Sequence, residues 1–78
     1  ERDRRDIWSR ILLERARQDT KFGAQHKLSP KDWLTILVEE VGEVAEAILE
    51  HDIDNYSVEL VQVAAVCVAA LECREAEA

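Results

Sequence analysis

The sequence predicts an all-α protein, a small bundle of three main helices that is completed by oligomerisation. Apolar residues recur at helical spacing, and the 78-residue chain contains only two Gly and one Pro. At this length a single hydrophobic core seldom supplies more than about 3–5 kcal/mol. We therefore expect residues 1–78 to form one domain that self-associates.

We expect the first helix between about Asp6 and Asp19. Five apolar residues recur there at helical spacing: Ile7, Trp8, Ile11, Leu12 and Ala16. Three polar residues fall on the opposite face: Arg10, Glu14 and Arg17. The stretch from Lys21 to Leu28 breaks this pattern and contains Gly23, so we expect it to be a loop.

The second helix has a clear predicted start. Ser29 is placed as its N-cap, Pro30 as its first residue, and Asp32 at the position that completes a capping box. We expect the helix to continue to about Glu50, where residues 51–55 supply a polar turn and another N-cap. The third helix is expected over residues 56–73, followed by a frayed tail at residues 74–78.

The third helix is apolar on nearly all sides. Between Val58 and Leu71, Glu59 and Gln62 alone are polar. A helix of this kind is normally buried all round, and two neighbouring helices in so short a chain cannot cover it. We therefore expect a second subunit to complete the bundle.

The net charge of −7 is unevenly distributed. Residues 1–31 hold nine Lys and Arg against five Asp and Glu, whereas residues 32–78 hold one against twelve. The acidic part should repel a nucleic-acid backbone, so we expect no nucleic-acid partner. A cation is the ligand that its charge favours.

The chain also has features that bear on its location. It has no window of about 18 uncharged apolar residues, which argues against a membrane span. Its start is charged and is not followed by an apolar segment, so no secretory signal is expected. Cys67 and Cys73 have no metal or redox spacing. These features predict a cytoplasmic protein.

Acidic residues interrupt the apolar faces of both later helices. At about 100° per residue, Glu40 falls inside the apolar arc of the second helix and Glu43 at its border, one turn apart. On the third helix Glu59 and Gln62 are also three residues apart. Three other acids fall on the solvated side of the second helix: Glu39, Glu46 and Glu50.

Carboxylates in a poorly solvated place need compensation, and three solutions remain open. They are shared protons with raised pKa values, a basic partner (Arg10, Arg15 or Arg17), or a divalent cation. Oxygen donors without Cys or His favour Mg²⁺, with Mn²⁺ as a substitute. Such an ion assists the attack of water on a phosphoanhydride. An ordinary solvated face is the alternative interpretation of the acids.

These residues resemble a known family. The segment Glu39-Glu40-Val41-Gly42-Glu43, followed by Glu59-Leu60-Val61-Gln62, resembles the ExxE…ExxD signature of MazG-like nucleotide pyrophosphohydrolases. These enzymes belong to the all-α NTP pyrophosphatase superfamily. The resemblance covers residues 14–73 and is to the short members found in phages and mobile elements.

The resemblance implies an all-α fold, assembly as dimers or dimers of dimers, and Mg²⁺ held by the four signature side chains. It also implies cleavage of a nucleoside triphosphate between its α- and β-phosphates. Glu40, Glu43 and Glu59 match the acidic ligands, whereas Gln62 stands where the family usually has Asp. Because an amide has no charge and cannot act as a base, we expect weaker metal binding and slow or absent turnover.

Other residues are candidates for contact with the nucleotide. Lys21 and Lys27, in the predicted loop, are placed to bind phosphate oxygens, with solvated surface lysines as the alternative. Trp33 and Phe22 are candidates for stacking on a base, although Trp33 also fits the core.

Two functions are therefore expected from the sequence. In the first, Glu40, Glu43 and Glu59 hold Mg²⁺ with Gln62 as a weaker ligand, and Glu43 orients the attacking water for pyrophosphohydrolysis. In the second, the protein is a non-catalytic oligomeric helical module that binds a nucleotide or a protein. Gln62, at the position where the family usually has Asp, then reflects the loss of catalytic activity.

Overall fold

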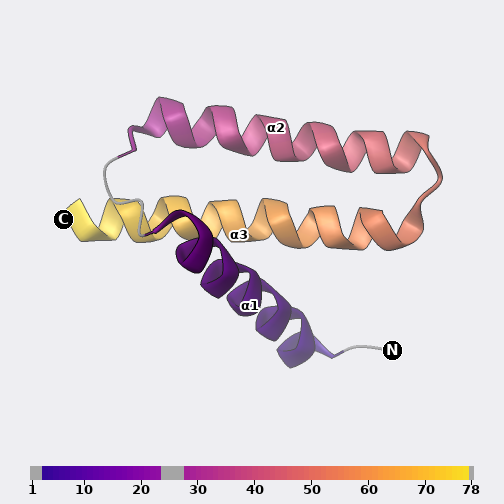
Figure 1. Ribbon diagram of the computed structural model, residues 1–78, viewed down its shortest axis with the longest axis horizontal. Helices are drawn as coiled ribbons and strands as arrows, with labels where there is room; N and C mark the ends of the chain where they lie inside the picture. The colour runs from indigo at the N-terminus through magenta and orange to yellow at the C-terminus, as the bar shows by residue number, and fades with distance from the viewer. Residues whose placement is uncertain (1–2, 24–27, 78) are drawn as a thin grey trace.

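The computed structural model describes residues 3–23 and 28–77 and confirms the all-α class. It consists of α1 (Arg4–Phe22), α2 (Pro30–Leu49) and α3 (Ile53–Glu77). Helices α2 and α3 lie antiparallel and side by side, and α1 lies obliquely across α3 (Figure 1). Both α1 and α2 pack against α3 and not against each other, so α3 is the central helix.

Helix α1 is longer than the sequence pattern predicted. The side chain of Asp3 accepts a hydrogen bond from the Asp6 amide at 3.0 Å and caps the first turn. Lys21 and Phe22, expected in a loop, form the last helical residues. The helix ends at Gly23, which has φ 75°, a conformation that other residues adopt only at a cost. The rest of the predicted loop, up to residue 27, lies outside the described residues.

The predicted start of α2 is confirmed. Ser29 Oγ accepts a hydrogen bond from the Asp32 amide at 3.3 Å, and the Asp32 carboxylate accepts one from the Ser29 amide at 3.0 Å. This reciprocal pair is a capping box, and Pro30 occupies the first turn, where its missing N–H is not needed. The helix ends at Leu49, one residue before the predicted end.

Helix α3 begins earlier and ends later than predicted. Asp52 accepts a hydrogen bond from the Asn55 amide at 3.0 Å, so helix formation starts at Ile53 rather than Tyr56. The turn before it contains His51 with φ 57°. The predicted fraying of residues 74–77 is wrong, because α3 remains helical to Glu77.

The core is small and is built mainly around α3. Its buried residues are Ile11, Ala47, Ala65, Val66, Ala69 and Cys73. Alanines on α3 permit the close approach of the neighbouring helices. Helix α1 contributes Ile11 alone to this set, and Trp8 and Leu12, which share its predicted apolar face, are exposed because the start of α1 diverges from α3 (Figure 1).

A second apolar face of α2 is exposed to solvent. Leu34, Val38, Val41 and Ile48 are each at least half exposed, and with Ala45 they recur at alternating spacings of four and three residues. This spacing produces a continuous stripe along one side of a helix. A single copy of the chain therefore leaves a large apolar surface in water.

The length and composition of α3 also bear on the membrane prediction. Ile53–Ala76 is long and apolar enough to cross a membrane by these two criteria, and within the described ranges it is the one helix that meets them. Only a minor share of the stretch is buried in the monomer. The exclusion of a membrane span, which rested on the lack of an uncharged window, is therefore too strong, although the fold is compatible with a soluble protein.

Candidate functional site

The predicted acidic residues converge between α2 and α3. Glu40 and Glu43 lie one turn apart on α2, and the antiparallel packing brings Glu59 of α3 opposite them. One carboxylate oxygen from each of the three lies within 4.8 Å of the others. The sequence thus correctly grouped three carboxylates from two helices.

Two of these carboxylates have oxygens without partners. Glu40 Oε2 and Glu59 Oε2 are buried and have no hydrogen-bond partner among the described residues, whereas Glu43 is exposed. An unpaired buried carboxylate oxygen is costly, so the cluster favours occupation by protons or by a cation.

Burial and neighbouring negative charges raise the pKa values of two members of this cluster, Glu40 and Glu59. Burial raises the pKa of Glu40, and the charges of Glu43, Glu14 and Glu39 raise it further. Burial also raises the pKa of Glu59, as do a hydrogen bond with Glu43 and the charge of that residue.

Gln62, predicted as the fourth ligand, has a different partner. Its side chain hydrogen-bonds to Glu14 of α1, a residue that the helical pattern placed on the exposed face. The Glu14 side chain is only 10% exposed, so that prediction is wrong. The sequence feature that could have indicated a paired Glu14 is its i,i+3 spacing from Arg17, because residues three apart on a helix can form an ion pair.

The arginines do not neutralise the three-carboxylate cluster. Arg15 forms ion pairs with Asp19 and Glu72, and Arg17 forms one with Glu14. Across residues 3–23 and 28–77, no arginine forms an ion pair with any member of the cluster. The alternative in which Arg10, Arg15 or Arg17 compensates the acids therefore has no support in the contacts.

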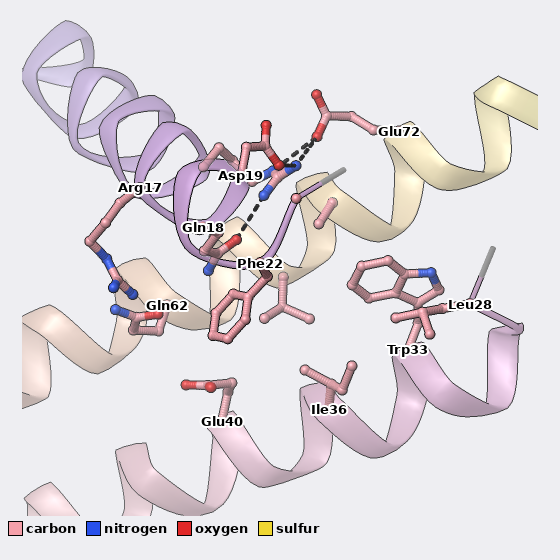
Figure 2. A pocket seen from close by; sticks show the side chains of 14 residues that line it. Arg17, Gln18, Asp19, Phe22, Leu28, Trp33, Ile36, Glu40, Gln62 and Glu72 are labelled. Atoms are coloured by element: carbon pink, nitrogen blue, oxygen red, sulfur yellow. Dashed lines mark hydrogen bonds and ion pairs between the residues drawn. The ribbon is translucent and has the colours of Figure 1, made fainter. Parts of the chain in front are cut away.

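A pocket of about 540 Å³ opens beside the cluster, with Glu40 in its wall. Figure 2 shows Trp33, Ile36 and Glu40 following one another along α2, with Phe22 facing them from α1. Apolar residues of α3 complete the lining, including Val66 and Ala69, and polar residues of α1 and α3 form the rim: Arg15, Arg17, Gln18, Asp19, Gln62 and Glu72. Apolar walls with a few polar groups are typical of a small-molecule site.

The predicted nucleotide contacts have different outcomes. Trp33 lines the pocket, and its indole Nε1 is buried without a hydrogen-bond acceptor among the described residues. Phe22 also lines the pocket. Lys21 is exposed, with Nζ 5.1 Å from the centre of the Phe22 ring, and it does not belong to the described lining. Lys27 lies outside the described residues.

The rim contains residues that sequence reasoning did not single out. Gln18, Asp19 and Glu72 are connected through Arg15, which donates hydrogen bonds to all three at 2.8–2.9 Å. Gln18 and Asp19 are three and four residues beyond Arg15 on α1, a spacing that indicates contact, whereas no local pattern indicates Glu72.

The comparisons with known proteins found no relatives. No protein-family model, curated protein or solved structure matches this chain. The fold and the site define a small all-α protein in which three carboxylates converge next to a partly apolar pocket.

Proposed function

We propose that this protein is a Mg²⁺-dependent nucleoside triphosphate pyrophosphohydrolase of the MazG-like type. The observation that carries the proposal is the convergence of Glu40, Glu43 and Glu59 within 4.8 Å of one another, with Glu40 also in the wall of a pocket. The motif resemblance predicted the same three residues as ligands.

The chemistry of the donors supports a hard divalent cation. All three groups offer carboxylate oxygens, and the two unpartnered oxygens of Glu40 and Glu59 are available to an ion. A divalent cation would also relieve the repulsion that raises the pKa values of both residues. Mn²⁺ would be accepted at the same donors.

The pocket next to Glu40 supports a nucleotide as the substrate. Its volume of about 540 Å³ lies within the range of small-molecule sites. Trp33 and Phe22 offer aromatic surface for the base, and the unpaired Trp33 Nε1 offers a hydrogen-bond donor. With the base in this pocket, the phosphates would extend toward the carboxylates.

The proposed reaction is the attack of water on the α-phosphorus. The P–O bond to the bridging oxygen of the β-phosphate breaks, pyrophosphate leaves, and a nucleoside monophosphate remains. When bound, Mg²⁺ supplies positive charge to the phosphate oxygens. Glu43 is the exposed carboxylate of the three, so it is placed to orient the water and accept its proton. Glu40 and Glu59 hold the cation.

A panel of NTPs and dNTPs, incubated with Mg²⁺ and assayed for pyrophosphate and monophosphate, tests the proposal. The Glu40→Gln/Glu43→Gln variant should lose the activity, while Glu39→Gln/Glu50→Gln, which removes the same charge from an exposed position of α2 and from its exposed C-cap, should retain it. Product formation that does not exceed that of the first variant rules out the enzyme.

One observation favours a second candidate, a non-catalytic nucleotide- or protein-binding module. The Gln62 side chain is engaged with Glu14, so this amide is directed to a protein carboxylate rather than held for a cation. Under this candidate, calorimetry would detect nucleotide binding without turnover, and Gln62→Asp would not create activity.

The apolar stripe of α2 supports a homo-oligomer, a dimer or a dimer of dimers. Leu34, Val38 and Val41 are exposed on a face whose spacing suits packing against the same face of a second copy. Cytoplasmic location is also part of the proposal. Cys67 and Cys73 are both free, as expected of thiols in a reducing compartment.

A further inference from the structure

Arg17 lies at the boundary between two hollows of the molecule. It lines the 540 Å³ pocket together with Glu40, and it also lines a smaller hollow of about 290 Å³ between α1 and α3. Gln62 lines both hollows as well. In Figure 2, Arg17 and Gln62 lie at the end of the pocket toward which the Glu40 carboxylate extends. A ligand at this end of the pocket would lie beside the Glu40 carboxylate.

Glu14 holds the guanidinium of Arg17 in a fixed orientation. Arg17 Nε donates to Glu14 Oε1 at 2.8 Å, and Arg17 Nη2 donates to Glu14 Oε2 at 2.6 Å. Glu14 is itself anchored, since Gln18 donates to it at 3.2 Å and Gln62 also hydrogen-bonds to it. A forked pair of this kind restrains the planar guanidinium more strongly than a single contact does.

Arg17 still has donors that point to no described partner. A guanidinium has five N–H groups, and the two bonds to Glu14 use two of them. Its side chain is 53% exposed, so the remaining donors are accessible.

Arg15, the other arginine of the pocket lining, is in a different state. Its side chain is 14% exposed, and all three of its nitrogens donate to Gln18, Asp19 or Glu72. Of the two arginines in the described lining, Arg17 is the more exposed and uses fewer of its N–H groups within the protein, so it is the one more available to a ligand. A pocket bordered by acidic residues needs such a cation if its ligand is anionic.

We propose that Arg17, oriented by Glu14, binds a phosphate group of the ligand that enters the pocket and is the phosphate-binding cation in place of Lys21 and Lys27. The proposal rests on the proposed function, because it takes the ligand to be a nucleoside polyphosphate. Glu14 is a positioning residue, and Arg17 contacts the substrate.

Isothermal titration calorimetry with two probes tests this assignment. The first probe is Mn²⁺ alone, and the second is a dNTP analogue with a non-hydrolysable α,β-imido group, in the presence of Mg²⁺. Arg17→Gln should weaken binding of the analogue about tenfold, the usual effect of losing a charged hydrogen bond, without weakening Mn²⁺ binding. Arg17→Lys should recover only part of the loss, since it keeps the charge but not the fork.

Two further variants separate positioning from charge. Arg5→Gln removes one positive charge from the exposed start of α1 and should change the affinity for the analogue less than twofold. Glu14→Gln removes a negative charge near the pocket, so charge alone predicts tighter binding of the analogue. Loss of the restraint on Arg17 predicts weaker binding, and weaker binding is the expected result.

The outcomes distinguish this inference from the proposed function. If the wild-type protein binds both probes and Arg17→Gln and Arg17→Lys behave like Arg5→Gln, the role of Arg17 is wrong and the proposed function stands. If the wild-type protein binds neither probe, both are wrong. Circular dichroism shows which variants fold, and Arg17→Lys, which keeps a cation beside Glu14, decides the question if Arg17→Gln does not fold.

Discussion

Arg15 of α1 and Glu72 of α3, which are 57 residues apart in the chain, form an ion pair that joins the two helices. Arg15 Nη2 lies 2.7 Å from Glu72 Oε1, and Arg15 Nε donates to the same oxygen at 2.9 Å. Asp19 also accepts a hydrogen bond from Nη2, and Gln18 accepts one from Nη1. Because α1 does not pack against α2, this network is a main polar attachment of α1 to the rest of the fold.

Replacing Arg15 by Gln should therefore destabilise the protein. We expect the free energy of unfolding to fall by about 1–2 kcal/mol, because a charged network with a largely buried guanidinium is lost while Glu72 remains half exposed to solvent. Urea unfolding followed by circular dichroism measures the change. Arg5→Gln, at a fully exposed position, is the matched control, and equal stabilities of the two variants would contradict the structural role of Arg15.

The raised pKa of Glu40 predicts an unusual pH dependence. The folded protein binds this proton more tightly than the unfolded chain, whose value is near 4.5, so the free energy of unfolding should fall as pH rises from 4.5 through the folded pKa. In a metal-free buffer with chelator, Glu40→Gln should therefore be more stable than the wild type at neutral pH. The difference should disappear below pH 4.5, where both states are protonated.

Urea unfolding at a series of pH values measures this difference. Glu50→Gln, which removes a carboxylate from the exposed C-cap of α2, is the control for the loss of one negative charge. Each variant must be compared with the wild type at the same pH, because Glu14 contributes the opposite pH dependence to the free energy of unfolding of both proteins. Its pKa is lowered, mainly by the hydrogen bonds from Arg17, so its contribution to stability is lost as pH falls below 4.5. If Glu40→Gln exceeded the wild type in free energy of unfolding by the same amount at all pH values, the raised pKa of the buried Glu40 carboxyl would be contradicted.

Addition of Mn²⁺ or Mg²⁺ should stabilise the wild-type protein. At a concentration 100 times the dissociation constant the gain is about 2.7 kcal/mol, because an ion bound to the folded state alone shifts the equilibrium by mass action. Glu40→Gln/Glu43→Gln should gain nothing, and Glu39→Gln/Glu50→Gln should gain as much as the wild type. Thermal unfolding with and without the ion checks the result, and Na⁺ at matched ionic strength controls for screening.

The sequence predicted the carboxylate cluster because its determinants are local. Glu40 and Glu43 are one turn apart, and Glu40 interrupts an apolar arc, so their convergence follows from helix geometry. The capping box at Ser29 was predictable for the same reason. Glu59 could be added because the motif resemblance connects the two helices.

The contacts of α1 could not be predicted in this way. Glu14 looked solvated because its own helix gives it a polar face, and only the packing of α1 against α3 buries it beside Gln62. Similarly, no local pattern connects Arg15 with Glu72. The start of α3 was misplaced because Asp52, rather than a later polar residue, caps the helix.

Replacing Gly42 by Ala should stabilise the monomer fold. Among the described residues nothing lies within 4 Å of the position that a Cβ at Gly42 would occupy, so an added methyl group meets no neighbour. An alanine within α2 should raise the free energy of unfolding by about 0.5–1 kcal/mol. Urea unfolding tests this, and destabilisation would indicate that another molecule occupies the space in solution.

The exposed stripe of α2 gives the last prediction, on self-association. Val38 is 60% exposed in the middle of the stripe, with Leu34 and Val41 one turn to either side. If two copies pack through this face, Val38→Glu places like charges in an apolar interface and should convert the oligomer to a monomer. Sedimentation velocity at several concentrations measures the mass. Thr35→Glu, an exposed position of α2 outside the stripe, adds the same charge and should leave the assembly intact, whereas dissociation of both variants or of neither would place the interface elsewhere.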